Sequence, residues 1–371
     1  MRYDADRLNS DTLGIVSDSD TIGIGVFMLT LLTCLALGAA PAEWQTAEAA
    51  HLKNIRQVTH DFVRAGEGYF SPDDKKIIFQ AEEQGSGNPF YQIFVMELDT
   101  GVYHRVSPGV GRTTCSYFRP DGKKIIFASS HLDPVAKARY TDEYRQREQE
   151  KASGKRRRYQ WDFDQYMDIF EANPDGSELK RLTRTPGYDA EGSYSPDGKQ
   201  IVFCSQRTGN LELFIMDADG KNARQLTHAP GCYNGGPFFS PDGRRVIFRS
   251  DRRKKDHLQL YVINADGTGE RALTDNLDWV YWAPFWYKDG KHIIYTAADH
   301  SNPAARPNYD VWWMNLDTGK QVRLTFAPGQ DVLPVFNADG TRMLWTSTRD
   351  GRQPAQLYSA DFIAPSSAEE Q

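Results

Sequence analysis

The chain has 371 residues, of which 39% are hydrophobic and 25% charged, so it can bury a large core and is not an intrinsically disordered protein. Its 44 Lys and Arg residues are outnumbered by 50 Asp and Glu, and the net charge of -6 argues against a nucleic-acid-coating protein. The four cysteines (Cys34, Cys115, Cys204 and Cys232) form no Cys-x-x-Cys pair, so we expect neither a zinc site nor a disulfide framework, and no cofactor.

The first 42 residues are expected to lie outside the fold. Residues 22–40 are apolar and uncharged, and Ala40-Pro41-Ala42 has the form of a signal-peptidase site. Residues 1–20 carry two arginines against five aspartates, an acidic balance where a signal peptide has positive charge. A membrane anchor also fits, because the apolar stretch has about the length that crosses a bilayer. We therefore expect an exported, periplasmic protein whose residues 1–42 form an acidic tail followed by a signal peptide or an anchor.

A ten-residue phrase recurs six times along the rest of the chain. It reads FSPDDKKIIF from Phe70, FRPDGKKIIF from Phe118, YSPDGKQIVF from Tyr194, FSPDGRRVIF from Phe239, WYKDGKHIIY from Trp286 and FNADGTRMLW from Phe336. The intervals between the aspartates of its turns (Asp73, Asp121, Asp197, Asp242, Asp289 and Asp339) are 48, 76, 45, 47 and 50 residues. The repeat therefore has one period throughout, with an insertion in the second copy.

Each copy predicts four antiparallel strands. Ser-Pro-Asp-Gly is a turn in which Pro and Gly supply the required dihedral angles, and Asp-Ala-Asp-Gly closes a second hairpin. A short strand ending in Leu-Thr or its equivalent follows each second hairpin except the last, and residues 55–59 (IRQVT) at the front of the chain have that same form. The pattern predicts an all-β, six-bladed propeller of residues 43–371, closed by an N-terminal strand that completes the last blade.

These phrases resemble the WD40-like (PD40) repeat of the TolB β-propeller family, over about residues 51–363. The resemblance implies an exported propeller, and TolB itself is a periplasmic part of the Tol–Pal envelope system. TolB has a small α/β domain before its propeller, whereas this chain has only Glu43 to Asn54 in that place. What carries over is a protein-binding role of the propeller. Similar repeats occur in oligogalacturonate lyases and in the propellers of prolyl-oligopeptidase-like hydrolases.

The more varied loops, which join strands two and three and connect successive blades, share one face of a propeller, and binding commonly uses such loops. Residues just after the blade-to-blade turns should ring the channel mouth on that face. Our candidate binding residues are Glu67, Tyr188, Asp189, Glu191, Tyr233, Asn234, Trp279, Tyr281 and Asp331. The four carboxylates among them either bind a cation or a basic peptide group, or simply line a water-filled channel.

The insertion at residues 131–164 of the second blade belongs to the same face. Its middle, Val135 to Lys151, predicts a charged helix with Glu143 and Arg147 one turn apart. A basic run at residues 155–158 and an aromatic patch follow the helix. The insertion is either a docking arm for an acidic partner or a solvated excursion.

Catalytic motifs are missing from the sequence: there is no Gly-x-Ser-x-Gly, no His-Glu-x-x-His and no histidine pair at metal-ligand spacing. We therefore expect no catalytic and no metal-binding residues. The favoured function is a scaffold that binds an envelope protein or peptide, with membrane attachment through residues 22–40 if these are kept. The alternative is a propeller enzyme of the oligogalacturonate-lyase or peptidase-associated type with a metal at the channel mouth.

Overall fold

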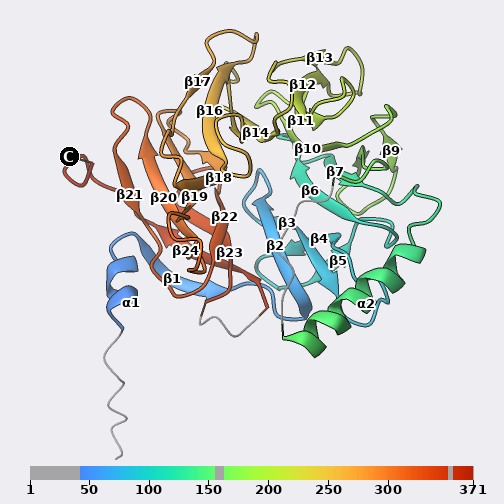
Figure 1. Cartoon of the computed structure of the whole chain (residues 1–371), viewed down its shortest axis with the longest axis horizontal. Helices are drawn as coiled ribbons and strands as arrows, with labels where there is room; N and C mark the ends of the chain where they lie inside the picture. The colour runs from blue at the N-terminus through green and yellow to red at the C-terminus, as the bar shows by residue number, and fades with distance from the viewer. Residues whose placement is uncertain (1–41, 155–162, 350–353, 371) are drawn as a thin grey trace, which may run out of the picture. The chain divides into compact units, whose positions relative to one another are not determined.

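Every copy of the repeat folds into one antiparallel sheet. The computed structural model describes residues 42–154, 163–349 and 354–370. These residues form six four-stranded sheets, or blades, together with helices α1 (Glu43–Glu48) and α2 (Ala138–Ser153) (Figure 1). The predicted six-bladed propeller is confirmed.

The six blades follow one another along the chain. Blade 1 consists of β2 (Phe62–Phe70), β3 (Lys76–Glu83), β4 (Gln92–Glu97) and β5 (Tyr103–Arg105). Blade 2 consists of β6 (Thr113–Phe118), β7 (Ile125–Ser129), β8 (Asp168–Ala172) and β9 (Lys180–Arg181). Blade 3 consists of β10 (Asp189–Tyr194), β11 (Gln200–Ser205), β12 (Glu212–Asp217) and β13 (Arg224–Gln225).

The second half of the ring repeats this order. Blade 4 consists of β14 (Asn234–Phe239), β15 (Arg245–Ser250), β16 (Gln259–Asn264) and β17 (Arg271–Ala272). Blade 5 consists of β18 (Trp279–Trp286), β19 (His292–Asp299), β20 (Asp310–Asn315) and β21 (Gln321–Arg323). Blade 6 consists of β22 (Asp331–Phe336), β23 (Arg342–Ser347), β24 (Gln356–Phe362) and β1 (Leu52–Gln57).

The innermost strand of each blade contacts the innermost strands of both neighbours, so β2, β6, β10, β14, β18 and β22 surround a common axis (Figure 1). The second strand of each blade is buried on both faces; Ile77, Ile78 and Phe79 of β3 are all 0% exposed. Such a continuous apolar run needs cover on both sides, and the stacking of neighbouring blades supplies that cover.

The Pro-Asp-Gly turns have the expected geometry. The turn glycine has a left-handed φ in five blades, for example +70° at Gly122 and +68° at Gly198. In blade 1 Asp74 stands in this position with φ +58°. Its carboxylate accepts hydrogen bonds from Asn337 Nδ2 (2.9 Å) and the Ala338 N–H (3.2 Å), so the exceptional residue links the turns of blades 1 and 6.

The Leu-Thr phrase works as a clasp within each blade. The outermost strand ends two residues before the Thr, and the Thr or Ser hydroxyl instead accepts a hydrogen bond from a backbone N–H near the start of the third strand. The six donor–acceptor pairs are Ile93–Ser107, Ile169–Thr183, Leu213–Thr227, Leu260–Thr274, Val311–Thr325 and Leu357–Thr59, at 2.8 to 3.0 Å. A buried N–H that lacks a strand partner is thereby satisfied.

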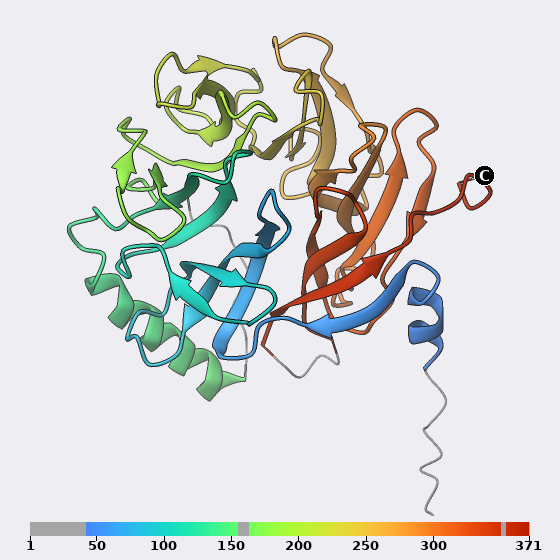
Figure 2. The same cartoon turned by 180° about the vertical axis from the view of Figure 1, so that it is seen from behind.

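The sixth clasp joins the two ends of the propeller. β1 pairs antiparallel with β24, with Arg56 opposite Ser359, and the Val58 N–H donates to the Leu357 carbonyl at 2.7 Å (Figure 2). The expected closure by an N-terminal strand is confirmed.

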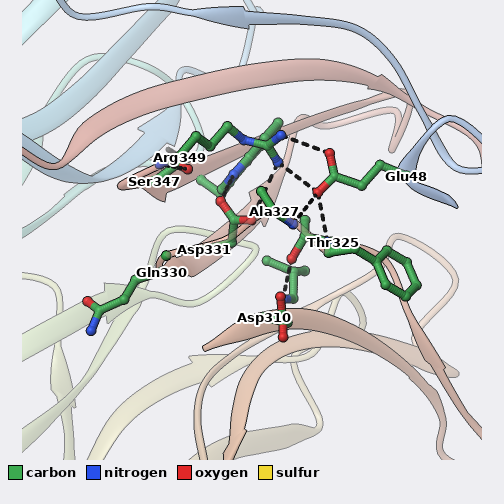
Figure 3. A network of polar contacts seen from close by, with 12 residues as sticks. Glu48, Asp310, Thr325, Ala327, Gln330, Asp331, Ser347 and Arg349 are labelled. Carbon is green, nitrogen blue, oxygen red and sulfur yellow. Dashed lines mark hydrogen bonds and ion pairs between the residues drawn. The ribbon is translucent and has the colours of Figure 1, made fainter. Parts of the chain in front are cut away.

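Helix α1 adds a second attachment to blade 6. Glu48 at its end is 0% exposed and forms a bidentate ion pair with Arg349, with N···O distances of 2.8 and 3.2 Å (Figure 3). The same carboxylate accepts hydrogen bonds from the N–H groups of Phe326 (2.7 Å) and Ala327 (3.1 Å). The segment that precedes β1 is therefore part of the packed structure.

The insertion in blade 2 contains helix α2, which begins three residues later and ends two residues later than Val135–Lys151. Arg147 pairs with Glu143 at 2.8 Å, as the spacing predicts, and also with Glu82 of blade 1 at 2.6 Å. Tyr140 accepts a hydrogen bond from the Gly111 N–H at 2.8 Å. The helix is thus held on the propeller, which the sequence did not indicate, because the partner on blade 1 is remote in the chain. The basic run at 155–158 lies outside the described residues.

The predictions for residues 1–41 likewise fall outside the part of the chain that the structure describes. Within that part, neither helix combines the length and the apolar character needed to span a bilayer.

Deletion of residues 51–60 should lower the melting temperature by about 10 °C or more, because blade 6 loses its outer strand and one clasp. Circular dichroism during heating measures this. An unchanged melting temperature would contradict the structural role of the closure.

Replacement of Glu48 by Ala should lower the free energy of unfolding by about 3 kcal/mol, because Arg349 is left buried without its bidentate partner. Urea unfolding measures the change. The matched control is Glu43→Ala in the same helix, where the side chain is exposed and little change is expected. Equal effects of the two substitutions would refute the role assigned to Glu48.

Candidate functional site

A β-bulge interrupts every innermost strand at the same place. The register of each innermost pair shifts there, and the residue three before the repeat phrase's first aromatic has φ between +47° and +59°. These bulge residues are Glu67, Cys115, Glu191, Gly236, Ala283 and Leu333. Bulges re-aim side chains, and here blades 1 to 3 place Glu67, Cys115 and Glu191 near the axis, whereas blades 4 to 6 contribute small or apolar residues.

Glu191 is the centre of a buried polar network between blades 3 and 4. Its side chain is 2% exposed and accepts hydrogen bonds from Tyr188 Oη (3.0 Å), Tyr233 Oη (2.7 Å) and the Gly236 N–H (2.5 Å). Arg249 forms an ion pair with it at 3.1 Å and donates to Tyr233 Oη at 2.8 Å. So many donors fix the position of this buried carboxylate.

Two glycines make room for this network. A Cβ atom on Gly235 would lie 2.1 Å from Tyr233 Oη, and one on Gly236 would lie 2.4 Å from Arg249 Nη1. The sequence Asn-Gly-Gly-Pro at residues 234–237, unlike its counterparts in the other blades, was the signal that could have disclosed a close approach at this position.

Glu67 lies in a different setting. Its carboxylate has only long contacts, to Tyr69 Oη (3.3 Å), Thr114 Oγ1 (3.5 Å) and Cys115 Sγ (3.8 Å). Burial raises its pKa to about 7, against the smaller opposing effects of the Cys115 hydrogen bond and the Arg249 charge. A carboxyl group that gains or loses a proton near neutral pH therefore stands beside the Glu191–Arg249 pair.

Asp189, Asn234 and Asp331 start their strands and are each bound to an arginine 18 residues later. Asp189 is 3.2 Å from Arg207, Asn234 Oδ1 accepts a hydrogen bond from Arg252 at 2.6 Å, and Asp331 is 3.4 Å from Arg349. We did not predict these arginines. The sequence feature that could have indicated them is Ser-x-Arg, which begins at the last residue of the second strand in three blades, at residues 205–207, 250–252 and 347–349.

The remaining candidates, Trp279 and Tyr281, stack on each other with ring centroids 6.1 Å apart and pack in the core between blades 4 and 5. The structure therefore brings Glu67, Tyr188, Glu191 and Tyr233 together and places the other five candidates in separate contacts. That these residues bind a ligand stays a prediction.

Four aromatic rings meet across the axis on the side of the Pro-Asp-Gly turns. Tyr69 of blade 1 lies 5.2 Å from Tyr117 of blade 2 and 5.8 Å from Phe238 of blade 4, and Phe238 lies 5.1 Å from Phe285 of blade 5 (centroid distances). Blades 1 and 4 are on opposite sides of the ring, so these rings, which we call the aromatic plug, obstruct the axis.

Beyond the plug a cavity of about 410 Å³ opens at the Pro-Asp-Gly face. The plug forms its floor, and residues of all six repeat phrases form its wall. The residues of this cavity, which we call the cup, are Tyr69, Phe70, Ser71, Pro72, Tyr117, Phe118, Pro120, Tyr194, Pro196, Phe238, Phe239, Pro241, Phe285, Trp286, Lys288, Phe336, Asn337 and Ala338. Loop variability does not indicate this face, because its turns are short and nearly identical in sequence.

The structure also brings together His257 and His300, whose ring centroids are 5.9 Å apart on neighbouring blades. His300 Nε2 is 2.8 Å from Tyr309 Oη. Within the described residues, no three His, Cys, Asp or Glu side chains are grouped so as to hold a metal ion.

Comparison with known proteins agrees with the fold. The family model "PD40: TolB beta propeller domain" matches residues 206–308, the stretch from blade 3 into blade 5. Over these residues the chain resembles the TolB-like PD40 propeller. "Tol-Pal system protein TolB" of Bordetella pertussis is 42% identical over 48 residues, which are 13% of this chain and 11% of that protein. The alignments thus span less than a third of the curated relatives' length.

Solved structures extend the likeness in fold to most of the propeller. TolB of Acinetobacter baumannii superposes with a TM-score of 0.52 at 18% identity, covering 81% of this chain and 64% of that one. An oligogalacturonate lyase of Vibrio parahaemolyticus superposes equally well, with a TM-score of 0.52 at 14% identity over 84% and 94% of the two chains. At such identities the likeness concerns the fold alone.

Replacement of Glu67 by Gln should stabilise the protein at pH 8 but not near pH 5. Because the folded state holds this proton more tightly than the unfolded state, the stability that protonation provides is lost as the pH rises from about 4.5 through about 7. The gap between variant and wild type should therefore grow to roughly 3 kcal/mol. Urea unfolding at both pH values measures it, with Glu148→Gln on the exposed side of α2 as control. A gap independent of pH would rule out titration of Glu67.

Proposed function

We propose that this TolB-like propeller is an exported scaffold that binds a protein or peptide at the cell envelope, in a role of the Tol–Pal type. The observation that carries the proposal is the cup: an open cavity of about 410 Å³ at the axis of a closed ring. Aromatic and prolyl side chains of its wall are the surfaces that protein interfaces and peptide-recognition grooves favour.

The rigidity of the ring supports binding without rearrangement. Each wall residue belongs to an innermost strand or its turn, and the six clasps and the β1–β24 pairing fix these strands. A preformed cavity of this kind loses little conformational entropy when a partner binds.

The relatives support the envelope setting. TolB is by its name a component of the Tol-Pal system, and the apolar residues 22–40 are what export or anchoring requires. The polar side of the axis contributes to the scaffold rather than to a vacant site, because Glu191, Asp189 and Asp331 already have arginine partners.

Photo-crosslinking in living cells tests the proposal. A benzophenone amino acid at position 338, on the cup's exposed rim, should give a discrete crosslinked product with an envelope protein. The control position is 102, where the Val side chain is 64% exposed on the outer turn of blade 1. The absence of a product at 338, or the same products at both positions, would refute the proposal.

Elemental analysis of the purified protein addresses the lyase-like alternative. A scaffold should contain no stoichiometric transition metal, whereas one equivalent of metal per chain, bound through axial residues, would favour an enzyme.

A further inference from the structure

One turn of the cup departs from the repeat in charge. The residue before the turn aspartate is Pro in four blades (Pro72, Pro120, Pro196 and Pro241) and Ala338 in the sixth. Blade 5 has Lys288 in this place, and it is the one charged residue in the cup's lining. An exposed Lys at a position otherwise occupied by apolar residues puts a single positive charge on an apolar rim.

Further cations gather on the same side. A second depression adjoins the cup and shares Pro241 and Lys288 with it. Arg245 and Lys291 also line it. The Arg245 guanidinium lies 4.9 Å from the ring centroid of Trp286, a wall residue of the cup, and donates to the Gly290 carbonyl at 2.7 Å. The charge therefore sits at a fixed place beside the apolar wall.

Among the described residues none of these three cations forms a close ion pair with a carboxylate, although Asp242 interacts electrostatically with Arg245 and Asp339 with Lys288. Lys288 donates to the Asp339 carbonyl oxygen, and Arg245 donates to the Gly290 carbonyl oxygen. The two carboxylates of the depression are engaged in their own turns: Asp242 accepts from Ser240 Oγ (2.5 Å), and Asp289 accepts from the Lys291 N–H (2.8 Å). The edge of the cup is thus suited to an anion.

The plug decides how a ligand can enter. Because Tyr69 and Phe238 obstruct the axis, a polypeptide cannot thread through the ring and can only end in the cup or cross it. The volume is at the small end of the range for ligand cavities, enough for a group the size of one or two side chains. A carboxylate on the Lys288 side must therefore be close to the apolar group that fills the cup.

We infer that the cup binds the C-terminus of a peptide, with an apolar last side chain against the plug and the terminal carboxylate on Lys288 and its neighbouring cations. A C-terminal residue carries an apolar group and a carboxylate on one Cα, which matches an apolar cavity with cations on one edge. This inference rests on the proposed function and specifies its ligand.

Fluorescence anisotropy with a labelled pentapeptide, Gly-Ser-Gly-Ala-Phe, tests the inference on the full-length protein. The free-acid peptide should bind about fivefold more tightly than its C-terminal amide at low salt. Lys288→Pro should remove this preference, since four other blades already carry Pro in the same turn and the fold should tolerate it. Lys123→Glu, an exposed change outside the cup, is the control and should keep the preference.

A filling variant tests the location. Ala338→Trp should weaken both peptides at least tenfold, because the new ring occupies the cup from its exposed rim. Equal binding of acid and amide, a preference that survives Lys288→Pro, or binding unaffected by Ala338→Trp would each overturn the inference. Equal or tighter binding of dodecanoate, a carboxylate on an acyl chain, would do so as well. If the crosslink at position 338 forms while acid and amide bind equally, the scaffold function stands and only the C-terminal assignment fails.

Discussion

The hydrogen bond from the Leu357 N–H to the Thr59 hydroxyl joins residues 298 positions apart, and the ring exists because of it and the strand pairing around it. Without this pairing β1 and β24 would each present an edge with unpaired backbone groups. An open row of blades would also leave β2 without its neighbour β22 and would lose the arrangement of innermost strands around one axis. The bulges, the plug and the cup all depend on that arrangement.

The two ends of the axis differ in chemistry although they are built from the same six strands. On one side Glu191, Arg249 and two tyrosines satisfy one another, so that polar groups hold blades 3 and 4 together. On the other side aromatic rings line the bottom of an open cavity. The polar side holds the ring in shape, and the apolar side carries the open cavity.

The repeats allow the fold to be predicted from the sequence. The turn residues, the apolar strands and the outer-strand sequence IRQVT at the front of the chain all predict the same architecture. Agreement between such independent signals specifies a fold. The arrangement of residues at the propeller axis could be predicted only in part. The position within a repeat places Glu67 and Glu191 near the axis, but their partners Thr114 and Arg249 come from other blades, and no local sequence pattern indicates them. The Leu-Thr pairs were recognised in the sequence but given another role. Each pair looks like the end of a strand, whereas the strand ends before it and the Thr hydroxyl accepts a hydrogen bond.

The cup escaped prediction for a related reason. Loop variety is the usual guide to a binding face, and the Pro-Asp-Gly turns have little. Each turn alone presents one aromatic ring and, in four blades, one proline, which is unremarkable on a protein surface. Only their convergence from six blades produces a cavity, and convergence is a property of the closed ring rather than of any segment.

Lys288 has a geometric meaning beyond its charge. Six near-identical turns would offer a ligand six equivalent orientations about the propeller axis, and a bound molecule would have no preferred one. The one charged turn breaks this pseudo-sixfold symmetry. A bound anion would therefore be oriented toward blade 5.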